Sequence, residues 1–76
     1  MRTYKLRLMI DDVRAPGGDR MVRAFNDAAA IKTVEAVAKN YPPPGNAALK
    51  FHLLVLTESE RLVKDINLAD FYPVLN

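Results

Sequence analysis

Four arginines in the first third of the chain are the residues whose type and spacing most suggest chemistry. Arg7 falls on the outward side of a predicted strand, and Arg14, Arg20 and Arg23 lie at or beyond the turn that follows it. Guanidinium groups bind phosphate through paired hydrogen bonds, and several together release counterions from nucleic acid. The four arginines therefore predict an anionic-ligand site for nucleic acid or for a phosphorylated small molecule, which symmetric copies of the chain could share.

The charge balance supports this hypothesis only in part. The formal net charge of the 76 residues is +2. Residues 1–26 carry six basic and three acidic side chains, whereas residues 27–76 carry five and six. The interleaved acids weaken the field of the arginines. A charged strand that merely protects a sheet edge from aggregation would show the same pattern, so this alternative stays open.

The residues for catalysis or metal binding are few. The chain has no cysteine and a single histidine, His52, which excludes disulfides, thiolate sites and histidine clusters. Asp11 and Asp12 are adjacent in sequence and would point to opposite faces of a strand, so they are poorly placed to chelate one cation. The segment 16–19 lacks the spacing of a phosphate-binding glycine loop. We therefore expect no enzymatic activity, no metal and no cofactor.

Strand and helix patterns organise the first half of the chain. Residues 3–10 alternate apolar and polar side chains, which is typical of a half-buried strand. Residues 15–18, Ala-Pro-Gly-Gly, predict a chain reversal. In the favoured interpretation residues 20–25 form a second strand, and Asn26 or Asp27 caps a helix that ends near Asn40. In the alternative, the helix already begins near Asp19.

The second half predicts two more strands. Prolines within residues 41–46 end the helix. Residues 48–56 and 61–66 read as a strand pair joined by a polar turn, and residues 67–72 as one helical turn.

The expected fold is one small α+β domain over residues 1–76. Its strand and helix order is ββαββ, or βαββ in the alternative interpretation. One helix packs on one face of a small antiparallel or mixed sheet. The order is common to many unrelated proteins and carries no functional information.

Self-association follows from an apolar excess. Residues 53–56 are apolar on both strand faces, and a single helix covers only one of them. Small domains without disulfides often gain stability by oligomerisation. We expect a symmetric homo-oligomer that also docks a protein partner. The interface residues predicted on this basis are Leu54, Val55, Leu56, Phe71, Tyr72 and Val74. Alternatively, the tail that contains the last three completes the core of one subunit.

The expected function is that of a non-enzymatic binding module, an accessory or inhibitor-like protein, a type that includes phage-encoded proteins. Residues 1–7 carry charges where a signal peptide would be apolar, and no apolar run reaches membrane-spanning length, so we expect a cytoplasmic location. Residues 41–44, Tyr-Pro-Pro-Pro, suit either a loop or a polyproline ligand. Binding of nucleic acid or a phosphorylated ligand through the arginines is the alternative function.

Overall fold

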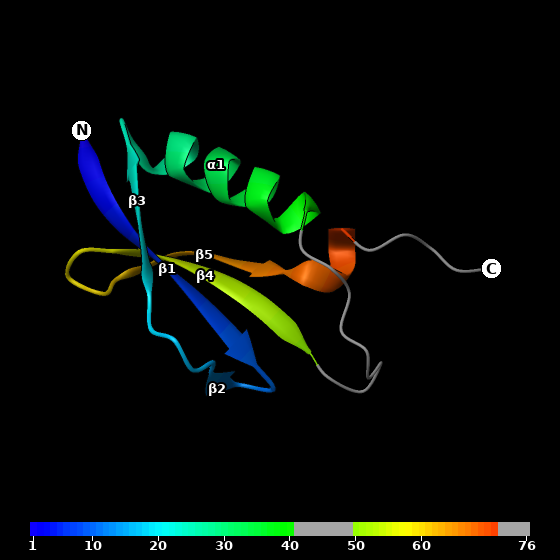
Figure 1. Cartoon of the computed structure of the whole chain (residues 1–76). Coiled ribbons are helices and arrows are strands. Elements are labelled where there is room, and N and C mark those ends of the chain that lie inside the picture. Colours follow the sequence, from blue (N-terminus) through cyan, green and yellow to red (C-terminus); the bar gives the residue numbers. More distant parts are fainter. Residues whose placement is uncertain (41–49, 72–76) are drawn as a thin grey trace.

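The computed structural model describes residues 1–40 and 50–71 of the chain. These residues form an antiparallel five-stranded sheet with one α-helix on one of its faces (Figure 1). In chain order the elements are β1 (Arg2–Ile10), β2 (Val13–Arg14), β3 (Arg20–Ala24), α1 (Asp27–Lys39), β4 (Phe51–Thr57), β5 (Leu62–Asn67) and the 3-10 helix η1 (Leu68–Phe71).

Strand β1 is the centre of the sheet. It pairs with β4 along one edge, and β4 pairs with β5. Its other edge is shared, because β3 pairs with residues 2–6 and the short β2 pairs with residues 9–10. The sheet therefore has one side that ends in β5 and one that ends in β2 and β3.

Helix α1 begins at a polar cap. The side chain of Asn26 accepts a hydrogen bond of 2.9 Å from the backbone N–H of Ala29, which satisfies one of the donors left free at a helix start. Along the helix Ala30, Val34 and Ala38 are buried against the sheet. Their spacing of four places them on one stripe, and two alanines let the helix approach the strands closely.

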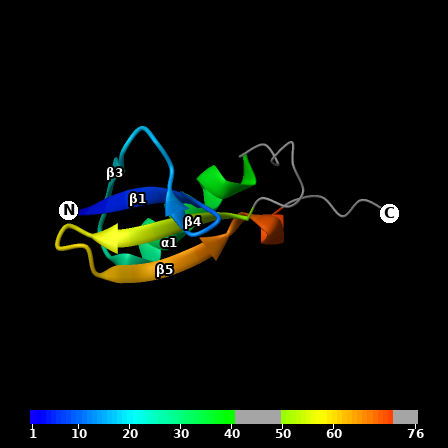
Figure 2. The same ribbon diagram turned by 90° about the horizontal axis from the view of Figure 1, so that it is seen from below.

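The core lies between α1 and the sheet. It is formed by side chains that alternate along the strands and share one face, among them Tyr4, Leu6, Leu53, Val55 and Ile66. Figure 2, seen from below, shows β1, β4 and β5 in front of α1, so the opposite face is not covered by this helix. We call that opposite face the outer face.

The expected small α+β fold with one helix is confirmed, and residues 20–24 form a strand rather than the start of the helix. The hairpin of β4 and β5 and the helical turn after it are also confirmed. The fourth strand begins at Phe51 rather than at residue 48. Residues 48 and 49, the proline segment and the tail after residue 71 lie outside the described residues.

Strand β2 was not predicted. Asp11 and Asp12 have φ angles of 50° and 66°, and this left-handed pair forms the tight turn that folds Val13 and Arg14 back onto the end of β1. Among the described residues no helix is long and apolar enough to cross a membrane.

Candidate functional site

The outer face of the sheet carries an ion-pair cluster around Arg7, formed by Lys5, Arg7, Asp19 and Glu60. Arg7 donates from Nε and Nη2 to the two carboxylate oxygens of Asp19, over 2.9 and 2.7 Å, and from Nη2 to Glu60 over 2.7 Å. Lys5 lies 3.6 Å from the same Glu60 carboxylate. The hydrogen bonds from Arg7 hold the pKa values of both carboxyls below their usual range. The charge of Arg7 is thus neutralised within the subunit.

The four predicted arginines do not share one surface. Arg14 pairs across the ladder with Met9, and Arg23 with Thr3, so both lie on the outer face. Six positions of β1 separate these two pairs, which corresponds to about 20 Å along a strand. Arg20 pairs with Leu6 and therefore lies on the helix face.

The residues predicted to form an interface also have different surroundings. Val55 is fully buried in the core under α1, and Leu56 is 4% exposed. Leu54 is half-buried on the outer face, and Phe71 is half-buried against the core. Tyr72 and Val74 lie outside the described residues. Of the predicted interface residues that the structure describes, only Leu54 and Phe71 are therefore partly accessible on the surface of one subunit. That they form an interface stays a prediction.

Leu56 is buried on the outer face, which the helix does not cover. It alternates with the helix-facing Val55, and its ladder partners are Lys5 and Leu62. The aliphatic part of a lysine can cover apolar surface while its ammonium group stays in water. Most of the apolar side chains at residues 53–56 are thus shielded from solvent within one chain.

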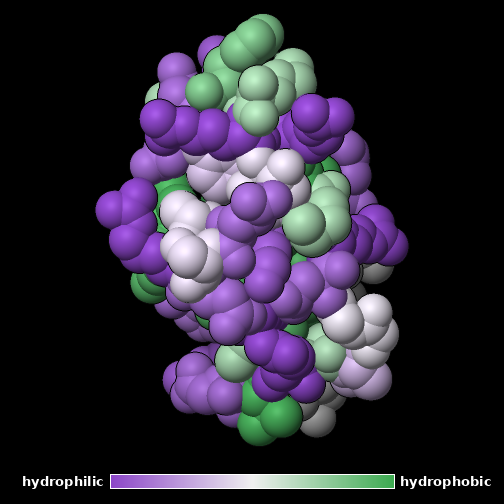
Figure 3. Space-filling model, turned by 90° about the vertical axis from the view of Figure 1, so that its left-hand side faces the viewer, coloured by the Kyte–Doolittle hydropathy of each residue, from purple (hydrophilic) through white to green (hydrophobic). Residues whose placement is uncertain are grey.

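The exposed apolar side chains gather elsewhere. Five large apolar side chains of the described residues are highly exposed, and three of them belong to β2, to β3 or to the residue after β3. These three are 58–74% exposed: Val13, Met21 and Phe25. Figure 3, which views the left-hand side of Figure 1, shows hydrophobic surface at the upper and lower ends of a mainly hydrophilic face.

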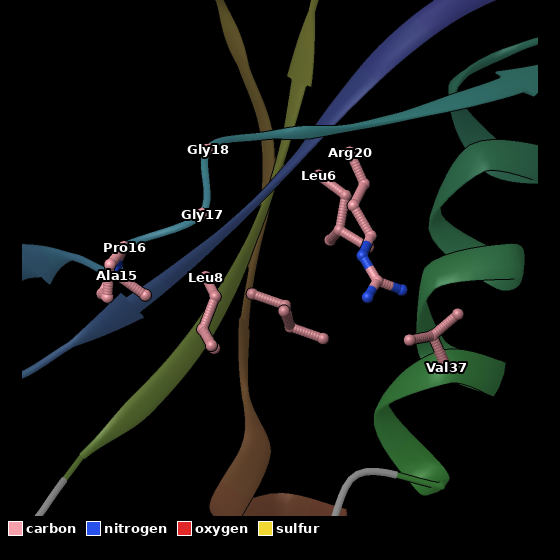
Figure 4. A pocket seen from close by; sticks show the side chains of 9 residues that line it. Leu6, Leu8, Ala15, Pro16, Gly17, Gly18, Arg20 and Val37 are labelled. Carbon is pink, nitrogen blue, oxygen red and sulfur yellow. The ribbon is translucent and has the colours of Figure 1, made fainter.

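A hollow opens on the helix face beside Arg20 (Figure 4). Its volume is about 180 Å³, and we call it the Arg20 hollow. It is bounded by β1, β4, the turn before β3 and the second half of α1, through Leu6, Leu8, Ala15, Pro16, Gly17, Gly18, Arg20, Val37 and Leu53. The sequence indicated this turn only as a chain reversal. Alternation along residues 20–24 could have indicated only that Arg20 shares a face with Val22 and Ala24, because its pairing with Leu6 depends on the register.

His52 forms a pair that sequence reasoning missed. Its Nδ1 lies 2.8 Å from Oδ1 of Asp65, across the ladder between β4 and β5 on the outer face. Such a pair resembles two parts of a nucleophile–base arrangement, but acyl transfer also needs a serine or cysteine next to the imidazole. Within residues 1–40 and 50–71, no hydroxyl group is hydrogen-bonded to His52, and no cluster of three metal-ligating side chains occurs.

Asp11 has a structural role. Its Oδ1 accepts a hydrogen bond of 2.9 Å from the backbone N–H of Lys50, and its own N–H donates to the Lys50 carbonyl. The aspartate thus joins the end of β1 to the start of β4.

Comparison with known proteins identifies no relative: no protein family model, no curated protein and no solved structure matches this chain.

Proposed function

We propose that this protein is a non-enzymatic binding module that works as a symmetric homodimer, joined through the free edge of β3. The observation that carries the proposal is a pair of exposed apolar side chains at this edge: Met21 lies within β3, and Phe25 follows it directly. Within the described residues β3 pairs with β1 alone, so its other edge presents unpaired backbone groups. The absence of cysteine supports a cytoplasmic location.

The sequence of β3 is complementary to itself. In an antiparallel pair around a two-fold axis at Val22, the two copies of Val22 face each other. Met21 then faces Arg23 of the second copy, and Arg20 faces Ala24 of the second copy. No like charges lie directly opposite, and the methionine packs along the aliphatic part of the arginine.

The edge of β5 is less suitable for the same pairing. A two-fold axis at Lys64 or at Asp65 would place two identical charges opposite each other, which destabilises a sheet. An axis at Val63 would avoid this, but Val63 has no ladder partner in β4, because the register shifts there. The ladder between β4 and β5 is also irregular at Val55 and Leu56. Bulges of this kind twist a strand edge away from further pairing.

Opposite charges at one position test this register. Met21→Lys places a cation opposite Arg23 of the second copy, whereas Met21→Glu removes the same apolar side chain but places an anion there. We expect Met21→Lys to raise the dissociation constant of the dimer by about tenfold and Met21→Glu to leave it near the wild-type value. Leu62→Lys, a matched change at the edge of β5, should have no effect.

Sedimentation equilibrium of the wild type and the three variants gives the masses. A wild-type protein that stays monomeric at high micromolar concentration contradicts the proposal. Equal dissociation constants for the lysine and glutamate variants contradict the register at Val22. Dissociation by Leu54→Lys, with Met21→Lys unchanged, would assign the interface to the outer face as the sequence first indicated.

A further inference from the structure

The Arg20 hollow combines an apolar floor with one cation. Leu6 and Leu53 are buried at its base, and Leu8 and Val37 are half-buried at its sides. Figure 4 shows the side chain of Arg20 extending from β3 toward Val37 of α1. A ligand in the hollow could therefore contact the apolar floor and the charged guanidinium at the same time.

Arg20 differs in this respect from Arg7. Arg7 lies among two carboxylates, whereas the ion pairs found among the described residues include none for Arg20. Asp19, the adjacent acid, is on the outer face and is bound to Arg7. Toward the described residues, Arg20 therefore keeps its hydrogen-bonding capacity on the helix face, next to the hollow.

The turn gives the hollow an opening without side chains. Gly17 and Gly18 have φ angles of 107° and 76°, and both line the hollow. A Cβ atom at either position would have no other atom within 4 Å, so the space beside the turn is open. A ligand can thus contact the floor from this side and still reach the arginine.

We propose that the Arg20 hollow binds a small carboxylic acid whose apolar part is about the size of one aromatic ring. An apolar cavity of about 150 Å³ binds benzene, and the hollow here measures about 180 Å³. The planar guanidinium fits a carboxylate through two parallel hydrogen bonds. The apolar group covers the leucine and valine side chains, and the carboxylate pairs with Arg20.

The site can be tested separately from the proposed dimer. Arg20 would face Ala24 of the second copy in that dimer, but the lining residues of the hollow belong to one subunit, and the test of the dimer changes Met21 on the outer face. Binding to the hollow can therefore be measured in the wild type and in Met21→Lys, and the two proposals can fail separately.

The experiment is an NMR titration of the ¹⁵N-labelled full chain with benzoate. Benzyl alcohol serves as a neutral molecule of the same shape, and inorganic phosphate as an anion without an apolar part. We expect benzoate at millimolar concentrations to shift the amide signals of Gly17, Gly18 and Val37, and to bind more tightly than either of the other two. Higher salt should weaken benzoate binding.

Two arginines of the same strand provide the matched variants. Arg20→Gln should reduce the affinity for benzoate about tenfold or more and leave that for benzyl alcohol unchanged. Arg23→Gln, which removes an exposed arginine from the other face of β3, should change neither. Both positions are exposed, and circular dichroism confirms folding before the titration.

Three results would overturn the proposal: no benzoate shifts near the turn, shifts centred on another surface, or equal benzoate affinity in Arg20→Gln and the wild type. Phosphate binding as tight as that of benzoate would also overturn it, because the apolar floor would then contribute nothing.

Discussion

Arg7 and Asp19 form a two-pronged ion pair on the outer face, with N–O distances of 2.9 and 2.7 Å. Their side chains are only 13% and 16% exposed. The pair joins the middle of β1 to the residue that precedes β3, and so fixes the end of the long turn between these strands. Planar arginine and carboxylate groups in this geometry are stronger partners than single-contact surface pairs.

The ion-pair cluster around Arg7 makes the stability of the fold depend on pH in the acidic range. Because the pKa values of Asp19 and Glu60 are lowered in the folded state, their contribution is complete above the unfolded carboxyl pKa of about 4. It is lost as the pH falls through the lowered folded values. We expect the midpoint of thermal unfolding to fall steeply below about pH 4, as measured by circular dichroism in a pH series.

Arg7→Gln separates the contribution of the Arg7 cluster to stability from that of the other carboxyl groups. The variant should melt at a lower temperature than the wild type at neutral pH, and the difference should shrink as the carboxyls become protonated. Lys32→Gln is the control, since Lys32 is exposed on α1 and forms no ion pair within the described residues. A constant difference between Arg7→Gln and wild type at every pH would show that the cluster contributes only packing.

Tyr4 provides a second titration at the other end of the pH range. Its buried hydroxyl donates a hydrogen bond of 2.7 Å to Asp27, and this bond, together with burial, raises the pKa of the phenol. A raised pKa stabilises the fold fully below the unfolded value of about 10, and this contribution is lost as the pH rises through the folded value. We expect Tyr4 to ionise above about pH 10, the value of a free tyrosine, in step with alkaline unfolding.

Absorbance of the phenolate measures this directly. Tyr4→Phe should remove a phenolate transition that lies above about pH 10, and should lower the thermal midpoint at neutral pH by a few degrees. Asp27→Asn keeps a hydrogen-bond acceptor but removes its charge, and should lower the pKa of Tyr4. If Tyr4→Phe removes no transition above about pH 10, the raised pKa of Tyr4 is wrong.

Local sequence patterns were sufficient for most of the fold. The alternation in residues 3–10 identified β1, and the capping chemistry of Asn26 separated β3 from α1. Strand β2 could not be found in this way, because two residues carry no periodicity. Its turn uses the left-handed conformations of Asp11 and Asp12, which aspartate tolerates but does not require.

The contacts that surface side chains make could not be derived from the same patterns. Arg7 was expected to face an anionic ligand, but its two partners lie 12 and 53 residues away, a distance in sequence that only the folded sheet closes. Leu56 was expected on an uncovered face, but it is only 4% exposed, with Lys5 and Leu62 as its partners across the ladder. Strand alternation gives the face of a side chain, whereas its partners depend on register and on turns.

The conformation of the turn before β3 gives the last prediction. Because no atom would meet a Cβ at Gly17 or Gly18, substitution there tests the backbone alone. The φ of 76° at Gly18 is close to the left-handed region that asparagine tolerates, whereas 107° at Gly17 lies beyond it. We expect alanine to cost about 1–2 kcal/mol at either position, and asparagine to recover stability only at Gly18. Urea unfolding measures these values. D-alanine at Gly17, introduced by chemical synthesis, should be as stable as glycine, and a loss there would show that space, rather than φ, selects this residue.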